Sequence, residues 1–294
     1  MHLPAGRLGG IRAAFNMSEQ NSPTTQNIFA TLRGPGQIWA IGAIHGEPLR
    51  LAAIHQRIAQ SIAPGDHLIY LGNIMGFGPD VLGAVRQALL FRRTLMARPG
   101  FENTTITFLR GAQEEMWQKL LQLQFAPNPA QVLDWMVRNG AEATIRAYGG
   151  SVEDGQLSAR EGTMALTKWT TALRANFRSH DGHMTLISVL KHAAFTEDQK
   201  VLLVHAGFDP SRPLSAQADS FWWGGKLWDE LDKDSRHPFQ MILRGSDRRR
   251  SELPESERKF DGRTLTLDGG CGFGGPLIAA CIAPNGSLLE VIEA

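Results

Sequence analysis

The stretch IWAIGAIHGEP, residues 38–48, sets a pattern that recurs along this chain. It predicts a short apolar strand that ends at a glycine turn and leads into a helix opened by Pro48. The strand and the glycine turn return in LIYLGNIMGFGPD (68–80), ITFLRGAQEEM (106–116) and VLLVHAGFDP (201–210). Side chains that follow the carboxyl ends of strands in an α/β sheet face a shared crevice. The repetition therefore predicts an α/β protein with one site built from several strand ends.

These segments resemble the motifs of the calcineurin-like metallophosphoesterases, specifically the bacterial serine/threonine protein phosphatase type. That family carries G-D-x-H-G, G-D-x-x-D-R-G, G-N-H-E, H-A-G and G-H at successive strand ends. The corresponding stretches here are GAIHG (42–46), GNIMGFG (72–78), GAQE (111–114), HAG (205–207) and GS (245–246). The resemblance implies a two-sheet β-sandwich flanked by helices, with a helical insert at about 113–200 and a closing hairpin near 267–280.

The first 36 residues differ in composition from the rest of the chain. They are polar and are interrupted by Gly, Pro, Ser and Asn, which is typical of a disordered arm. We therefore predict a disordered N-terminal arm over 1–36, within which Met17 is an alternative start, and a phosphoesterase-like domain over 37–294.

The departures from the family motifs concern the metal ligands. The family holds two divalent metals, such as Mn, Fe or Zn, with carboxylates, an asparagine and histidines. The corresponding positions here are Ala43, His45, Asn73, Ala112, His205 and Ser246. Both aspartates are replaced, and hard dications prefer anionic oxygen ligands. We therefore expect a degenerate member with no metal centre and no other cofactor.

Two further positions bear on catalysis. The histidine that serves the family as general acid is Gln113 here, and an amide cannot donate a proton as an acid at neutral pH. The arginines that the resemblance assigns to phosphate binding are Phe77 and Gly225. We therefore predict no catalytic residue and treat these positions as vestiges. A rebuilt metal site from His45, His205 and the nearby Asp247 stays open as an alternative.

The run RGSDRRR (244–250) borders the same site. Arginine forks bind phosphate without a metal, so Arg244, Arg248, Arg249 and Arg250 are candidates for anion binding. An ordinary solvated charge run is the alternative. We predict a cleft with this basic rim and an apolar floor made by Ala43, Met75 and Phe77. The competing expectation is that Phe77 fills the space that the metals and phosphate left.

These observations favour a pseudophosphatase that acts by binding a protein partner or a phosphorylated ligand. A hydrolase with a rebuilt site and a structural or oligomerisation subunit are the alternatives. The net charge of +1 gives no reason to expect nucleic acid or a membrane as partner. No stretch approaches 18 consecutive apolar residues, and the two cysteines are expected to be reduced and buried, as in a cytoplasmic protein.

Overall fold

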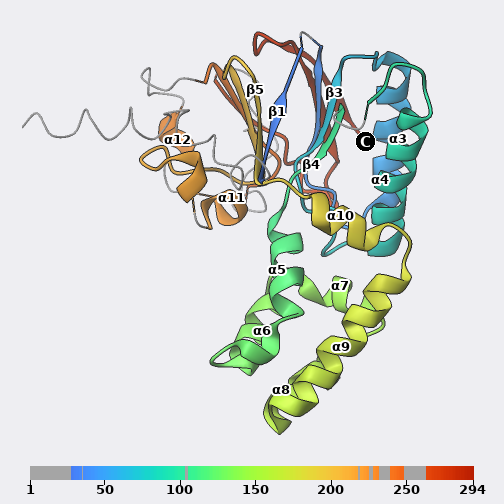
Figure 1. Cartoon of the computed structure of the whole chain (residues 1–294), viewed down its shortest axis with the longest axis vertical. Helices are drawn as coiled ribbons and strands as arrows, with labels where there is room; N and C mark the ends of the chain where they lie inside the picture. The colour runs from blue at the N-terminus through green and yellow to red at the C-terminus, as the bar shows by residue number, and fades with distance from the viewer. Residues whose placement is uncertain are drawn as a thin grey trace, which may run out of the picture.

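A computed structural model describes residues 28–34, 36–102, 105–217, 219–224, 228–231, 239–247 and 263–294. Two five-stranded sheets form its centre, with helices on the outside and a helical arm below (Figure 1). This arrangement confirms the predicted α/β sandwich of two sheets flanked by helices.

The first sheet has the strand order β10-β9-β2-β3-β4. Its strands are β2 (Ile38–Ile41), β3 (His67–Tyr70), β4 (Ile106–Phe108), β9 (Ile278–Ile282) and β10 (Leu288–Glu293). The strands β2, β3 and β4 run parallel, and all of their residues are buried. A parallel strand that is covered on both faces needs a nearly continuous apolar run, which the sequence provides with His67 and Thr107 as the polar exceptions.

Two helices cover the outer face of this sheet, α3 (Pro48–Ser61) and α4 (Val81–Met96) (Figure 1). Each follows one of the glycine turns. Pro48 lies in the first turn of α3, and the carboxylate of Asp80 accepts a hydrogen bond from the Gly83 amide at the start of α4. The strand–turn–helix pattern of the sequence therefore accounts for the two helices on this face of the sheet.

The second sheet has the order β1-β5-β6-β7-β8. Its strands are β1 (Phe29–Leu32), β5 (Ala193–Thr196), β6 (Val201–Val204), β7 (Met241–Arg244) and β8 (Thr264–Thr266). Residues 29–32 were predicted to belong to the disordered arm, but they pair in parallel with β5. Leu32 is buried between the sheets and Phe29 packs with Phe221, which explains the correction. Residues 1–27 of the predicted arm lie outside the described residues.

The predicted insert is helical up to residue 189 and then returns to the sheet through β5, so its predicted end at 200 was too late. It contains α5 (Ala112–Leu120), η3 (Leu123–Phe125), α6 (Pro129–Arg138), α7 (Ala141–Ala147), α8 (Val152–Glu161), α9 (Thr163–Ser179) and α10 (His183–Val189). Side-chain caps begin two of these helices, because Asn128 accepts from the Gln131 amide and Ser151 accepts from the Asp154 amide. The helices extend away from the sheets as an arm (Figure 1).

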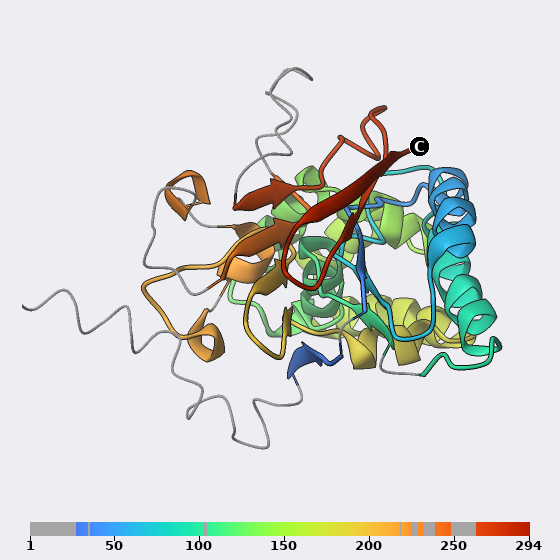
Figure 2. The ribbon, with the colours of Figure 1, turned by 90° about the horizontal axis from the view of Figure 1, so that it is seen from above.

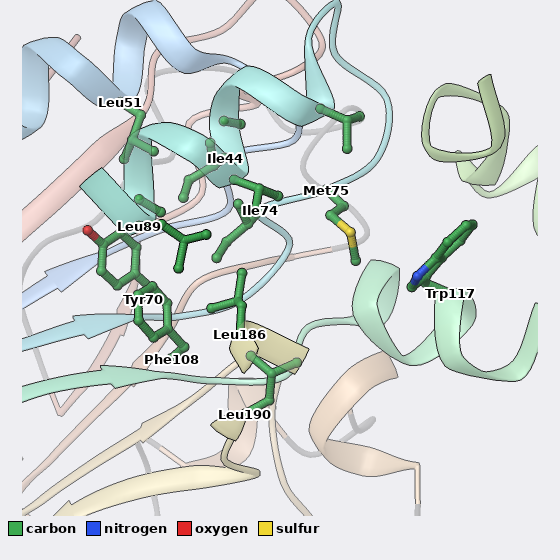
Figure 3. Close-up of a cluster of buried hydrophobic side chains, with 14 of the residues drawn as sticks. Ile44, Leu51, Tyr70, Ile74, Met75, Leu89, Phe108, Trp117, Leu186 and Leu190 are labelled. Carbon is green, nitrogen blue, oxygen red and sulfur yellow. The ribbon is translucent and has the colours of Figure 1, made fainter. Parts of the chain in front are cut away.

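The buried side chains join these parts. One cluster fills the space between the sheets, and a larger one lies beneath α3 and α4 and continues into the arm. In Figure 3, Tyr70 and Phe108 lie near the sheet, while Met75 lies toward Trp117 of the arm. Tyr70 and Phe108 stack with centroids 4.5 Å apart. Burial of this continuous apolar surface fixes the arm against the strand ends that carry the site.

The chain ends in an antiparallel pair, β9 and β10, joined at the turn that contains Asn285 and Gly286. Figure 2, seen from above, shows this pair in red. Cys271 and Cys281 are both free and buried, as expected. Across the part of the chain that the structure describes, we find no helix with the length and apolar character required to span a bilayer.

The described part also includes η4 (Leu214–Ala216), α11 (Ser220–Trp223) and α12 (Trp228–Leu231). They follow β6 and cover the second sheet on the side away from α3 and α4 (Figure 1). Their aromatic side chains Phe221, Trp222 and Trp228 pack into one cluster with the sheet. Most of this tryptophan-rich stretch is therefore core.

Candidate functional site

The predicted motifs meet at one edge of the sandwich. The Ala43 amide donates to the Gly245 carbonyl at 2.9 Å, and the His45 amide donates to the Asn73 carbonyl at 2.7 Å. A Cβ added at Gly72 would lie 2.6 Å from the Gly111 nitrogen and 2.9 Å from a His205 ring nitrogen. All five strand-end loops therefore converge, as their repetition in the sequence predicts.

Backbone strain is concentrated in these loops. His45, Asn73 and Phe77 have φ values of 51°, 53° and 41°, in the left-handed region that favours glycine. Among the described residues, Gln199 is the other non-glycine residue with positive φ. Strain of this kind costs on the order of 1–3 kcal/mol per residue and gathers at functional sites. The strained backbone of these loops is therefore typical of a functional site.

A buried carboxylate holds two of the loops together. The Glu114 side chain accepts from the amides of Asn73, Ile74, Met75 and Gly111 at 2.8–3.2 Å. Burial raises the pKa of this carboxyl group, while these amide donors oppose the shift. The motif pattern of the sequence gives no sign of this role. In the structure Glu114 fastens the loop that carries Asn73 to the start of α5.

His205 lies at the centre and is fully buried. Its Nδ1 is 2.7 Å from the Leu71 carbonyl oxygen, which can only accept, so Nδ1 carries the proton and Nε2 presents a lone pair. That Nε2 is buried without a hydrogen-bond partner in the described structure. Burial lowers the pKa of His205 to about 4, so the ring is neutral at pH 7.

His45 is buried next to it. Its Nε2 lies 3.4 Å from Nδ2 of Asn73, and its Nδ1 is buried with no hydrogen-bond partner in the described structure. Burial and the neighbouring His205 lower the pKa of His45 to about 3. The two histidines that match the motifs are therefore uncharged and buried.

Asn73 and Gln113 place neutral side-chain amides at two further motif positions. Oδ1 of Asn73 accepts from the Gln113 amide at 2.9 Å. Nε2 of Gln113 donates to the Asn139 carbonyl at 2.8 Å and links α5 to the end of α6. Both side chains are thus engaged with the protein itself.

The residues present do not fit a pair of dications. Ala43 and Ala112 place buried methyl groups where the resemblance implies metal ligands, and Asn73 provides a neutral amide. The described part of the chain contains no group of three or more His, Cys, Asp and Glu side chains able to hold a metal ion. Two such ions need anionic oxygen ligands to bind close together.

Asp247 and Arg244 form a buried ion pair. The same guanidinium donates through Nε to Oγ1 of Thr266 at 2.9 Å and lies 4.3 Å from the ring centroid of Trp228. Arg244 was predicted to be part of the basic rim of the cleft, and the structure places it instead as a buried residue. Arg248, Arg249 and Arg250, like Gly225, lie outside the described residues.

A cavity of about 230 Å³ opens over the motif loops. Phe77 lines it without closing it, since 38% of the residue is exposed. The ring packs at its rim against Phe273, with centroids 4.5 Å apart. Met75 was predicted to form the floor but is buried in the core, and Ala43 is buried as well. The lining is His45, Asn73, Phe77, Ala112, Gln113, Arg138, Asn139, Trp222, Trp223, Ser246, Asp247, Asp268, Gly270 and Phe273.

Several of these lining residues were missed by the sequence analysis. Asp268 accepts from the amides of Asp247 and Gly270 and shapes the loop that carries Phe273. Phe273 is 59% exposed within the glycine-rich stretch GGCGFGG (269–275). A single large apolar residue among glycines was the available signal. Arg138 and Asn139 reach the site through the arm, which local sequence could not indicate.

No family model matches the chain, and no curated protein matches it. Among solved structures, a protein provisionally named a diadenosine tetraphosphatase is 21% identical, covers 91% of this chain and 98% of its own, and gives a TM-score of 0.55. A serine/threonine phosphatase from Saccharomyces cerevisiae is 15% identical, with 97% and 88% covered and a TM-score of 0.47. A metallophosphoesterase from Sphaerobacter thermophilus is 13% identical, with 89% and 88% covered and a TM-score of 0.43. The first of these shows that the chain has a phosphoesterase-type fold.

Proposed function

We propose that this chain is a pseudophosphatase, which keeps a phosphoesterase-type fold and acts by binding a ligand or protein partner in the cleft over the former metal site. The observation that carries this proposal is the state of His45 and His205. Among the described residues, no group of three or more His, Cys, Asp and Glu side chains surrounds these rings, so they lack the carboxylates that would hold a pair of dications.

The surroundings of His45 support the same conclusion. Its ring lies 5.2 Å from the Phe77 ring and 5.6 Å from the Phe273 ring, measured between centroids. Aromatic rings in these positions leave only 5% of His45 exposed, whereas metal-assisted hydrolysis needs an activated water at the reacting phosphorus. With its two thiols reduced and buried, the protein is proposed to act in the cytoplasm.

One observation favours a second candidate, a hydrolase with a rebuilt metal site. Nε2 of His205 and Nδ1 of His45 are buried without partners in the described structure, and such atoms cost about 1–3 kcal/mol each when they stay unpaired. A metal ion bound at either atom would satisfy it. Asp247, the acid that the sequence suggested as third ligand, is instead paired with Arg244.

Metal content and activity of the full chain test the proposal together. Protein purified after growth with manganese and zinc should contain far less than two metals per chain by elemental analysis. It should hydrolyse p-nitrophenyl phosphate and a phosphopeptide no faster than the His205→Ala protein. Stoichiometric metal, or turnover that disappears in His205→Ala, would favour the rebuilt hydrolase.

A further inference from the structure

A second cavity lies beside the cleft, between the start of α4 and the helix α7. Its volume is about 570 Å³, against about 230 Å³ for the cleft, and it falls within the roughly 300–1,000 Å³ of pockets for drug-sized ligands. Residues 77–82 form one wall, and Val137, Gly140 and α7 form the other. We propose that this cavity, the α4–α7 groove, binds a neutral, apolar small molecule. The inference goes beyond the proposed function and does not depend on whether the cleft binds metal.

The charged side chains of the groove already have partners. Glu142 and Arg146 pair across one turn of α7, with 2.6 Å between Oε1 and Nη2, and their side chains are 44% and 64% exposed. Asp80 is exposed to water and caps α4, where its Oδ1 accepts from the Gly83 amide at 2.7 Å. These three are the charged residues of the described lining. Burying a charged ligand in the groove would therefore cost free energy that no unpaired, buried counter-charge offsets.

The rest of the described lining consists of apolar side chains and glycines. Leu82 and Val137 are half-buried and line the groove with apolar surface that remains open to water. Ala143 and Ala147 lie one helical turn apart on α7, so their small methyl groups face the same side and bound the cavity. An apolar ligand is stabilised there because it removes this surface and its own from water.

Contacts behind the groove hold both walls. The Gly78 amide donates to the His45 carbonyl at 2.7 Å. The Asp80 amide donates to the Gly46 carbonyl at 3.0 Å. Ile145 anchors α7, because its side chain is fully buried in the core that continues into the arm. The groove is therefore formed without a ligand, and binding does not carry the cost of opening it.

The Phe77 ring separates the groove from the cleft. On the groove side it lies against Gly140, where an added Cβ would be 2.4 Å from Cε2 of the ring. On the cleft side it contacts His45 and Phe273, with 5.2 Å and 4.5 Å between ring centroids. The groove and the cleft therefore share one side chain as a wall but have different linings.

The test is a fluorescence titration of the full chain with two dyes that share one aromatic skeleton. N-phenyl-1-naphthylamine is neutral, and 1-anilinonaphthalene-8-sulfonate carries an added sulfonate. We expect the neutral dye to saturate at one molecule per chain and to bind about 10-fold or more tightly than the sulfonate, because the described lining gives the anion no unpaired cation. No saturable binding of the neutral dye, or a sulfonate that binds as tightly, would each overturn the inference.

Substitutions on α7 locate the dye. Ala147→Trp places a large side chain in the groove and should weaken binding of the neutral dye about 10-fold or more. Ala175→Trp is the matched control, because Ala175 is an exposed alanine of α9 outside the described groove lining. If Ala147→Trp does not fold, Ala143→Leu makes the same test with a smaller side chain. Unchanged dye binding in a folded groove variant, or equal weakening in the control, would contradict the assignment.

Two further measurements exclude other occupants and other sites. Sedimentation velocity shows whether the groove holds a second copy of the chain, and a dimer that the neutral dye dissociates would overturn the small-molecule assignment. Added manganese should leave the affinity for the dye unchanged, because the described groove lining contains no His or Cys. Competition between manganese and the dye would place the dye in the cleft instead. Metal-free, inactive protein that fails to bind the dye overturns the groove site alone and leaves the pseudophosphatase proposal standing.

Discussion

The ring of His45 lies edge-on to the ring of Phe77, with 5.2 Å between their centroids and 76° between their planes. Phe77 stands where the sequence resemblance implies a phosphate-binding arginine. An apolar ring therefore lies beside a buried, neutral histidine at the position where the resemblance implies a cation.

Restoring carboxylates should restore metal affinity before it restores catalysis. Asp at position 73 keeps the acceptor for the Gln113 amide, so Asn73→Asp is compatible with the local hydrogen bonds. We expect the combined Ala43→Asp and Asn73→Asp protein to bind manganese more tightly by calorimetry but to remain nearly inactive. Phe77, Ala112 and Gln113 still provide neither the phosphate contact nor the acid. Phosphatase activity restored by these two changes alone would contradict this reading of the site.

Loss of the Glu114 carboxylate should destabilise the whole protein. In Glu114→Gln an NH₂ group faces backbone amides that need an acceptor, and each unpaired buried donor costs about 1–3 kcal/mol. We expect the free energy of unfolding in urea to fall by about 2–4 kcal/mol, as for other buried networks that lose a partner. Glu142→Gln is the control, because that carboxylate is exposed and pairs with Arg146 on the surface. A loss in Glu114→Gln no larger than in the control would show that these amides have other partners.

Local sequence patterns were sufficient for the strands that lead into the motif loops and for the convergence of those loops. Unbroken apolar runs predict buried parallel strands, and glycine turns at their ends predict a shared site. The same patterns misplaced Arg244, because its burial depends on Asp247 and on Trp228 contacts that only the fold creates. Strand β1 was missed for a related reason. Its four residues become a strand by pairing with β5, which begins more than 150 residues later.

The helix residue His55 makes stability depend on pH. It is buried, stacks on Phe91 with centroids 3.9 Å apart, and uses both ring nitrogens in contacts with Tyr70 and Gln87. Burial lowers its pKa from 6.5 to about 3. Between these values the unfolded chain binds a proton that the folded chain does not, so the contribution is complete above pH 6.5 and is lost as the pH falls.

For one such histidine, the free energy of unfolding should fall by about 1.4 kcal/mol for each pH unit below 6.5. We therefore expect the free energy of unfolding, measured in urea between pH 6.5 and 4, to fall less steeply with decreasing pH in His55→Gln than in the unchanged protein. His45, His183, His192 and His205 also have lowered pKa values, so a dependence from these groups remains in the variant. Identical slopes in the two proteins would show that His55 is accessible to protons in the folded state.

Glycine should be required at position 140 for two reasons, the nearby ring of Phe77 and the left-handed backbone of the residue itself. Its φ of 98° is left-handed, and a Cβ there would lie 2.4 Å from Cε2 of the Phe77 ring. Gly65 is a matched control with a φ of 94° and nothing within 4 Å of the added Cβ. Gly65→Ala should cost about 1–2 kcal/mol for the left-handed backbone alone. Gly140→Ala should cost more, because the ring must move or the α6–α7 turn must open.

A double-mutant cycle separates the two causes. When Phe77→Ala is already present, the added methyl at residue 140 meets no ring, so the cost of Gly140→Ala should fall toward that of Gly65→Ala. The interaction energy should reach about 0.5–3 kcal/mol, the range for residues in contact. Urea unfolding of the four proteins measures it, and an interaction near zero would mean that Phe77 does not rest on Gly140 in solution. Because Phe77 also lines the cleft, a positive result ties the end of α6 to the shape of the proposed binding site.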